Sequence, residues 1–161
     1  MKLNLTALQE IVSRAISKVL ACDSELLERD ASEWSIAHRL AVYLEQEIPG
    51  WHVDCEYNRQ GPERAIKEMP TGDPEKNKIR PDIIIHHRGG IEREHNLLVV
   101  EIKKKESDSD LGKVSEYTRM PAGKRKFQYQ FGLALALKPS PKMRWYVNGT
   151  EVANDGENRS Q

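Results

Sequence analysis

The chain has 161 residues, of which 31% are charged and 6% aromatic, and its 25 basic and 25 acidic side chains leave no net charge. This size predicts one domain with a hydrophobic core, and the neutral balance argues against indiscriminate binding of nucleic acid. No apolar stretch reaches membrane-spanning length, and Cys22 and Cys55 lack the spacing of a disulfide framework or a metal site. We therefore expect a reduced, cytoplasmic protein with no membrane partner.

The first 56 residues predict two helices and a strand. Apolar residues at helical spacing indicate an amphipathic helix over residues 4–20 and a second over residues 31–47, which ends before Pro49 and Gly50. Asp30 and Glu33 fit a capping box at the start of the second helix. Glu33 also lies on the apolar face of that helix, so it could point toward a sheet, and the residues leave both roles open. Alternating apolar and polar residues then predict a half-buried strand that begins at residue 51.

The remainder of the chain alternates between loops, strands and one helix. Residues 58–78 are rich in glycine, proline and charge and predict a long loop, which is either a flap over a substrate or a disordered insertion. Two apolar runs at 80–85 and 97–103 indicate neighbouring buried strands, joined by a turn near Ile91 and Glu92. A helix over 108–120 and strands over 127–137 and 143–147 follow. We expect a single domain over residues 1–150 and a polar tail over 151–161.

Three ionisable residues at the ends of the two apolar runs need an explanation, because charged side chains are rarely buried unless they are paired or bind a metal. Asp82 opens the first run, and Glu101 and Lys103 close the second, where they project from the same face. An antiparallel hairpin would place Asp82 almost opposite Glu101, within reach of a shared cation such as Mg²⁺. Lys103 could then orient or deprotonate an attacking water, or neutralise charge on a phosphate. The pattern predicts phosphodiester hydrolysis with a divalent metal.

A plain structural explanation stays open beside this one. Asp82 could be a turn residue at the start of a strand, and Glu101 and Lys103 could form a cross-strand ion pair on a wet face of the sheet. The combination of Pro81-Asp82 and Glu-x-Lys on consecutive strands favours the functional explanation.

The sequence Pro81-Asp82, followed by Glu101-Ile102-Lys103, resembles the signature of the PD-(D/E)xK phosphodiesterase superfamily, and the resemblance covers about residues 30–147. It implies a restriction-endonuclease-like α/β fold, in which helices flank a mixed central β-sheet with the core order α-β-β-β-α-β, here with an extra N-terminal helix. It also implies a metal-dependent nuclease that hydrolyses DNA and leaves a 5′-phosphate and a 3′-hydroxyl. Two such sites are needed to cut both strands of a duplex, so a homodimer is a further expectation.

The resemblance also implies roles for individual residues. Asp82, Glu101, Lys103 and Glu33 would be the catalytic set. Mg²⁺ or Mn²⁺ would be bound by Asp82, Glu101 and the backbone carbonyl of Ile102, and by Glu33 directly or through water.

Basic residues beyond the motif are candidates for contacts with nucleic-acid phosphates, with ordinary solvation as the alternative for each one. They are Lys104, Lys105, Lys113, Lys124, Arg125 and Lys126. His86 shares the strand face of Asp82 about 13 Å further along, and we expect it on the surface.

Two other functions stay open. One is a catalytically inactive nucleic-acid-binding or regulatory protein on the same fold, because the family that the chain resembles includes members that lost the chemistry. The other is an interaction protein in which residues 1–20 bind a partner and the sheet charges are structural.

Overall fold

The computed structural model describes residues 3–57, 59–60, 65–66, 80–105, 108–121 and 127–154, with the backbone alone at 59–60, 65–66 and 108–110. Its α-helices are α1 (Leu5–Cys22), α2 (Ser24–Glu28), α3 (Glu33–Glu47) and α4 (Asp108–Thr118), and a 3₁₀ turn spans Arg93–His95. Its strands are β1 (His52–Cys55), β2 (Arg59–Gln60), β3 (Ala65–Ile66), β4 (Ile83–His86), β5 (Asn96–Lys103), β6 (Phe131–Ala136), β7 (Lys142–Val147) and β8 (Thr150–Val152). None of these described helices is long and apolar enough to cross a bilayer.

Six strands form one mixed sheet in the order β1-β4-β5-β6-β7-β8, and β2 pairs with β3 in a separate two-stranded ribbon. Strands β5 and β6 run parallel, whereas the other neighbours in the large sheet are antiparallel. A parallel pair needs a crossover connection, and α4 lies in the segment that connects β5 to β6. The α/β class and the mixed sheet with helices that the sequence predicted are therefore confirmed.

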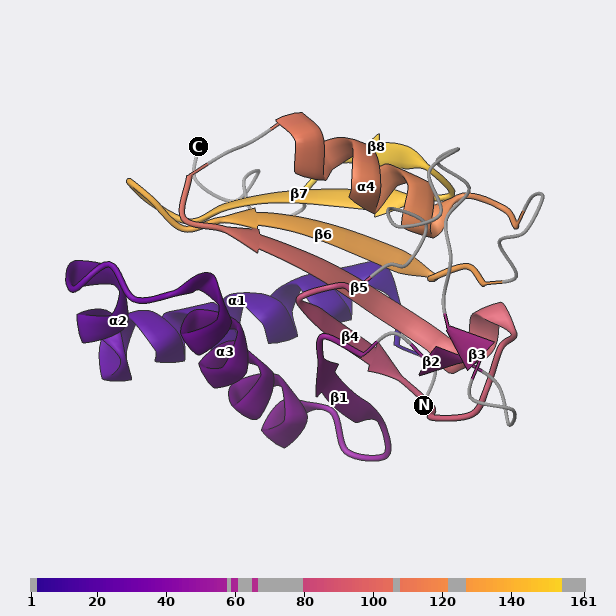
Figure 1. The fold of residues 1–161 in the computed structure, drawn as a ribbon, viewed down its shortest axis with the longest axis horizontal. Coiled ribbons are helices and arrows are strands. Elements are labelled where there is room, and N and C mark those ends of the chain that lie inside the picture. Colours follow the sequence, from indigo (N-terminus) through magenta and orange to yellow (C-terminus); the bar gives the residue numbers. More distant parts are fainter. Residues whose placement is uncertain are drawn as a thin grey trace.

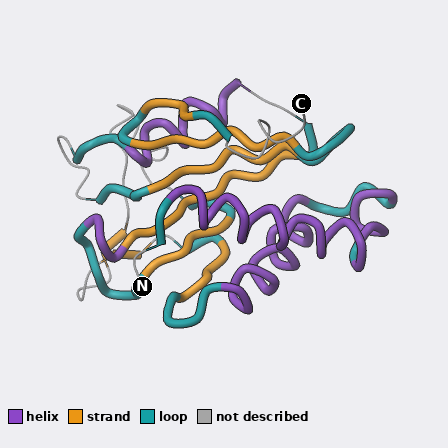
Figure 2. The backbone as a smooth tube through the Cα atoms, turned by 180° about the vertical axis from the view of Figure 1, so that it is seen from behind, coloured by secondary structure: helices purple, strands orange, loops and turns teal. Residues whose placement is uncertain are grey.

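Helices cover both faces of the sheet (Figures 1 and 2): α1, α2 and α3 lie on one side and α4 lies on the other. The alternation of side chains along the strands explains this arrangement. Ile83, Ile85 and Val100 join the large hydrophobic cluster with α1 and α3, whereas Ile84 and Val99 pack in a second cluster with Tyr117 of α4. The strands β4 and β5 are thus buried from both sides.

Helix α4 approaches the sheet very closely at Gly132 of β6. A Cβ atom on Gly132 would lie 2.6 Å from a methyl carbon of Val114 and 2.9 Å from that of Thr118. The turn between β7 and β8 is bonded to the same helix, because Ser115 donates to the carbonyl of Gly149 (2.7 Å) and the Gly149 amide donates to Thr118 Oγ1 (2.9 Å). These contacts fix α4 over the centre of the sheet.

Several local predictions differ from the structure. Ser32, rather than Asp30, caps α3, since its hydroxyl accepts from the Ser35 amide at 3.3 Å; Asp30 has a positive φ of 54°. The expected strand at 127–137 begins at Phe131; of the residues before it, Tyr129 donates its amide to the carbonyl of Tyr117 on α4. Helix α2 and strand β8 were not predicted, and the expected polar tail is wrong at 151–152, which pair with β7. The predicted loop 58–78 contains β2 and β3, and its other residues lie outside the described part.

Candidate functional site

Asp82 and Glu101 lie beside each other on the face of the sheet that α4 covers. Ile83 pairs with Val100, and the next step along the antiparallel register joins Asp82 to Glu101. Asp82 shares the strand face of Ile84, and Glu101 shares that of Val99, both of which pack against α4. The juxtaposition that the hairpin geometry predicted is therefore confirmed.

Asp82 is a half-buried carboxylate held by the backbone of β5. Its Oδ2 accepts a hydrogen bond of 2.6 Å from the amide of Ile102. Burial raises the pKa of Asp82 above its usual value, against the opposing effects of this hydrogen bond and the charge of Lys103. The charge of Glu33 raises it further. The hydrogen bond and the nearby positive charges therefore stabilise the ionised form of Asp82 by less than burial and Glu33 destabilise it.

Glu101 is 6% exposed and receives a hydrogen bond of 3.1 Å from the hydroxyl of Tyr117 on α4. Burial first, and then Glu101, raise the pKa of Tyr117 far above its usual range, so the hydroxyl keeps its proton and remains a donor. The sequence analysis assigned no role to Tyr117. The available signal was that a buried tyrosine hydroxyl usually finds a polar partner, and Glu101 is a buried acceptor on the facing strand.

Lys103 and Glu33 form an ion pair that joins the end of β5 to the start of α3. Lys103 Nζ lies 3.0 Å from Glu33 Oε2, and the other oxygen of Glu33 accepts from the Lys104 amide at 3.3 Å. Glu33 is the first residue of α3, where the helix dipole favours a negative charge. The structure therefore places Glu33 next to the motif, where its carboxylate pairs with Lys103. The capping box was the alternative role for Glu33, but the residue that caps α3 is Ser32.

A pocket of about 270 Å³ lies beside Asp82, between α3 and the β1 end of the sheet. Trp34, Ala37 and His38 of α3 line one wall, and Cys55 and Glu56 line the other. Trp34 is 62% exposed, so the pocket is bordered by a large side chain that solvent can reach. One edge of the candidate site is therefore accessible to a small group.

The carboxylate oxygens at Asp82 and Glu101 are of the type that hard cations prefer as ligands. Mg²⁺ is usually bound through one or two carboxylates together with water and substrate phosphate, and Asp82 and Glu101 supply two. Among the described residues, no three His, Cys, Asp or Glu side chains are placed so that they could hold an ion together. Asp82 and Glu101, which the β4–β5 register sets side by side, are therefore candidate side-chain ligands, and Glu33 pairs with Lys103.

Comparisons with protein-family models, curated proteins and solved structures find no match to this chain.

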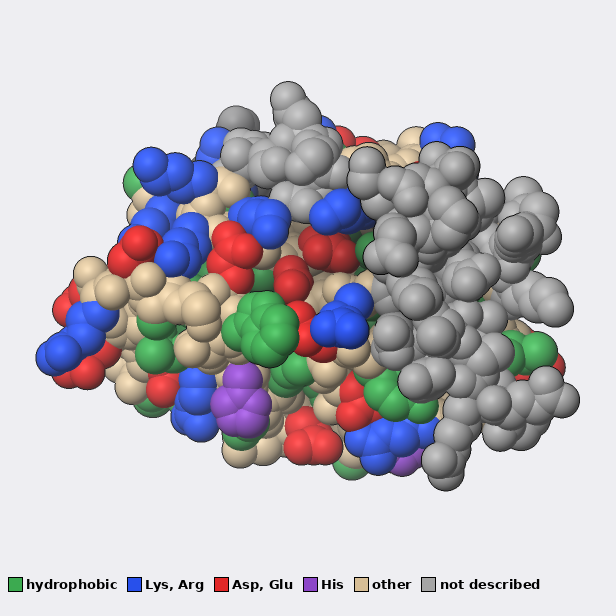
Figure 3. Space-filling view, in the orientation of Figure 1, with side chains coloured by type: hydrophobic (Ala, Val, Ile, Leu, Met, Phe, Trp, Pro, Cys, Tyr) green, Lys and Arg blue, Asp and Glu red, His purple; other side chains and the backbone are tan. Residues whose placement is uncertain are grey.

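The predicted phosphate contacts lie in different settings. Lys104 Nζ is 3.0 Å from Asp30 Oδ1, Lys105 is exposed beyond the end of β5, and Lys113 is exposed on α4, where its charge acts on Asp82. Residues 124–126 lie outside the described part of the chain. Basic and acidic side chains gather side by side on this face of the molecule (Figure 3), so the surface is not a patch of one sign.

A second polar group lies on the same sheet face and was missed by the sequence analysis. His86 is 2% exposed, so its predicted surface position is wrong; its Nε2 lies 2.8 Å from Asp54 Oδ2. Arg88 Nε also donates to Asp54, at 2.8 Å. Burial opposes ionisation of Asp54, but the bonds from Arg88 and His86 outweigh it and hold its pKa well below the usual range. The antiparallel pairing of β1 with β4 explains this cluster. It sets Asp54 opposite Ile84 and His52 opposite His86, so that His86 is a diagonal neighbour of Asp54 on the same sheet face.

Proposed function

We propose that this protein is a metal-dependent nuclease that hydrolyses phosphodiester bonds of DNA, on a restriction-endonuclease-like fold. The observation that carries the proposal is the placement of Asp82, Glu101 and Lys103 on one sheet face at the ends of two paired strands. The order α3, β1, β4, β5, α4, β6 supports it, because it follows the core order that the sequence resemblance implied, with the β2–β3 ribbon inserted.

Each side chain has a role that follows from its surroundings. Asp82 and Glu101 would hold Mg²⁺ or Mn²⁺, with the carbonyl of Ile102 as a further predicted ligand. The bound ion would offset negative charge on the scissile phosphate. Tyr117 keeps Glu101 oriented, because its hydroxyl donates to the carboxylate from a fixed position on α4. The ammonium group of Lys103 lies at the same edge of the sheet and would stabilise negative charge on the phosphate. Glu33 positions this ammonium group through their ion pair.

Magnesium-dependent cutting of plasmid and single-stranded DNA tests the proposal. The wild type is expected to cut, whereas Asp82→Ala and Lys103→Ala lose activity by about 100-fold or more, as is typical when charge stabilisation in a site is removed. Glu94→Ala and Lys18→Ala are matched controls, because both residues lie outside the site, and they should retain wild-type activity. Equal cutting by the wild type and both site variants would contradict these assignments.

A catalytically inactive nucleic-acid-binding or regulatory protein is the second candidate function. One observation favours it: Asp82, Glu101 and Glu33 each accept a hydrogen bond from within the protein, and the described residues gather no three-ligand cluster. Calorimetric titration of Mn²⁺ in the presence of DNA separates the two. Absence of binding would favour the inactive protein, and saturable binding that Asp82→Ala abolishes would favour the nuclease.

A further inference from the structure

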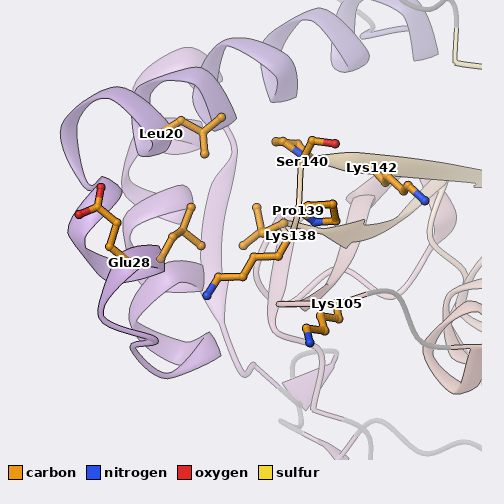
Figure 4. Close-up of a pocket in the computed structure, with 10 residues that line it drawn as sticks. Leu20, Glu28, Lys105, Lys138, Pro139, Ser140 and Lys142 are labelled. Atoms are coloured by element: carbon orange, nitrogen blue, oxygen red, sulfur yellow. The ribbon is translucent and has the colours of Figure 1, made fainter.

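A large groove of about 880 Å³ lies next to the candidate site, where the α1–α2 end of the helical layer faces the turn between β6 and β7 (Figure 4). Its lining is mainly apolar. The apolar side chains are Leu20, Leu27, Leu137, Pro139 and Pro141. Leu20 is 38% exposed, which is unusual for leucine on a core-packing helix, so apolar surface remains open to solvent here.

Three lysines stand around this apolar surface. Among the described residues that line the groove, Lys105, Lys138 and Lys142 are basic and Glu28 is acidic; Glu28 lies at the α2 end in Figure 4. Lys138 also reaches Asp30 at 3.5 Å, a long and solvent-exposed contact that contributes little to stability. The lining therefore combines an apolar floor with a positive rim, which fits a ligand that is both apolar and anionic.

The groove is joined to the candidate site through consecutive residues. Lys103 belongs to the site, and Lys105, only two residues further along the chain, lines the groove. Between them, Lys104 bonds through its amide to Glu33 and through its ammonium group to Asp30. A polymer whose phosphate lies at Lys103 would therefore continue past Lys105 into the groove.

We propose that this groove binds an unpaired, single-stranded segment of nucleic acid next to the scissile phosphate; this rests on the proposed nuclease function. The lysines contact successive phosphates, and the leucine and proline surface receives the faces of the bases. A duplex presents phosphates but keeps its base faces stacked inside, so it could use the rim but not the floor. The apolar floor therefore selects a single strand, which exposes both groups.

The dependence of binding on salt tests the groove independently of cutting. A fluorescein-labelled oligothymidine is titrated in EDTA over a range of KCl concentrations, with a blunt duplex as the second probe. Each phosphate contact with a single strand contributes about 0.7 to the slope of log K against log salt. We expect Lys105→Gln/Lys138→Gln to bind the single strand roughly tenfold more weakly and to lose about 1.4 from the slope.

Two further variants separate the floor from the rim. Leu20→Ser should weaken single-strand binding roughly threefold with no change in slope, because apolar contact releases no counterions. Arg93→Gln is the matched control, since Arg93 is exposed at the opposite end of β5, and it should leave affinity and slope unchanged. Leu20→Ser and Arg93→Gln should bind the duplex as the wild type does, whereas the double lysine variant should lose less affinity for the duplex than for the single strand.

The groove proposal would be overturned if the double lysine variant bound the single strand with unchanged affinity and slope. It would also be overturned if the wild type did not bind the single strand. An equal loss with the duplex would overturn its single-strand selectivity. A wild type that binds through the groove but does not cut with Mg²⁺ would instead overturn the nuclease function alone. The two proposals therefore fail in distinguishable ways.

Discussion

Asp82 is a half-buried carboxyl group whose raised pKa gives the replacement Asp82→Asn a specific signature. The folded state disfavours its ionised form, so the metal-free protein loses stability as pH rises from the unfolded to the folded pKa. Asn keeps an oxygen acceptor for the Ile102 amide and removes the charge. In EDTA at neutral pH, Asp82→Asn should therefore unfold at an equal or higher temperature than the wild type, and this difference should vanish in acid.

The same replacement should reduce metal-dependent cutting by more than about 100-fold, because even residues behind metal ligands change activity by 10–100-fold. Thermal unfolding and DNA cleavage measured on one preparation check both effects. Glu94→Gln, an exposed carboxyl replaced in the same way, should change neither. A marked loss of stability at neutral pH in Asp82→Asn would indicate that the carboxylate is structural.

The sequence located the strand carboxylates but not all of their partners. Asp82 and Glu101 could be paired because side chains alternate along strands and the two residues are equally far from the turn. The Tyr117 hydroxyl and the His86–Asp54 pair could not, because those contacts depend on how α4 and β1 pack against β5 and β4. Local pattern specifies which face a residue occupies, whereas its bonding partner depends on tertiary packing.

Helix α4 depends on a small residue beneath it, and Gly132→Ala tests this dependence. The added methyl group would meet Val114 and Thr118 well inside contact distance and push α4 away from the sheet. We expect a loss of about 1–3 kcal/mol in the free energy of unfolding, as is usual for overpacking. Cutting should fall as well, because Tyr117 would move from Glu101.

Gly112→Ala provides the control within the same helix. Its Cβ would have no neighbour within 4 Å, so this replacement should stabilise α4 by about 0.5–1 kcal/mol through helix propensity. Urea denaturation measures both variants. If Gly132→Ala were as stable as the wild type, the close packing of α4 on β6 would not be required.

At the scale of elements, long periodic segments were predictable and short ones were not. Helices α1 and α3 begin and end within two residues of their predicted bounds, because each carries a sustained apolar stripe. Strand β8 has only three residues, two of them exposed, so no local pattern marks it. Its existence depends on pairing with β7 through the Asn148-Gly149 turn, where both residues have positive φ.

The whole molecule should respond to metal as one cooperative unit, because the proposed ligands come from β5 and from the residue directly before β4, two paired strands inside the sheet. At a Mg²⁺ concentration 100 times the dissociation constant, binding stabilises a protein by about 2.7 kcal/mol. For a chain of this length, that corresponds to a rise of roughly 5–10 °C in Tm. Calorimetry gives the dissociation constant first, and scanning fluorimetry with KCl at matched ionic strength then measures the shift. Asp82→Asn should abolish the shift, and a shift of equal size in that variant would place the ion elsewhere.

The hydrogen bonds that join Gly149 to Ser115 and Thr118 link the C-terminal hairpin of β7 and β8 to helix α4. Deleting the polar segment from residue 148 onward would remove an edge strand and also release the last turn of α4, the helix whose Tyr117 donates to Glu101. Chemical damage at this peripheral hairpin, such as deamidation of the Asn148-Gly149 step, would therefore be transmitted across the sheet to the carboxylates, although no atom of the hairpin belongs to the site.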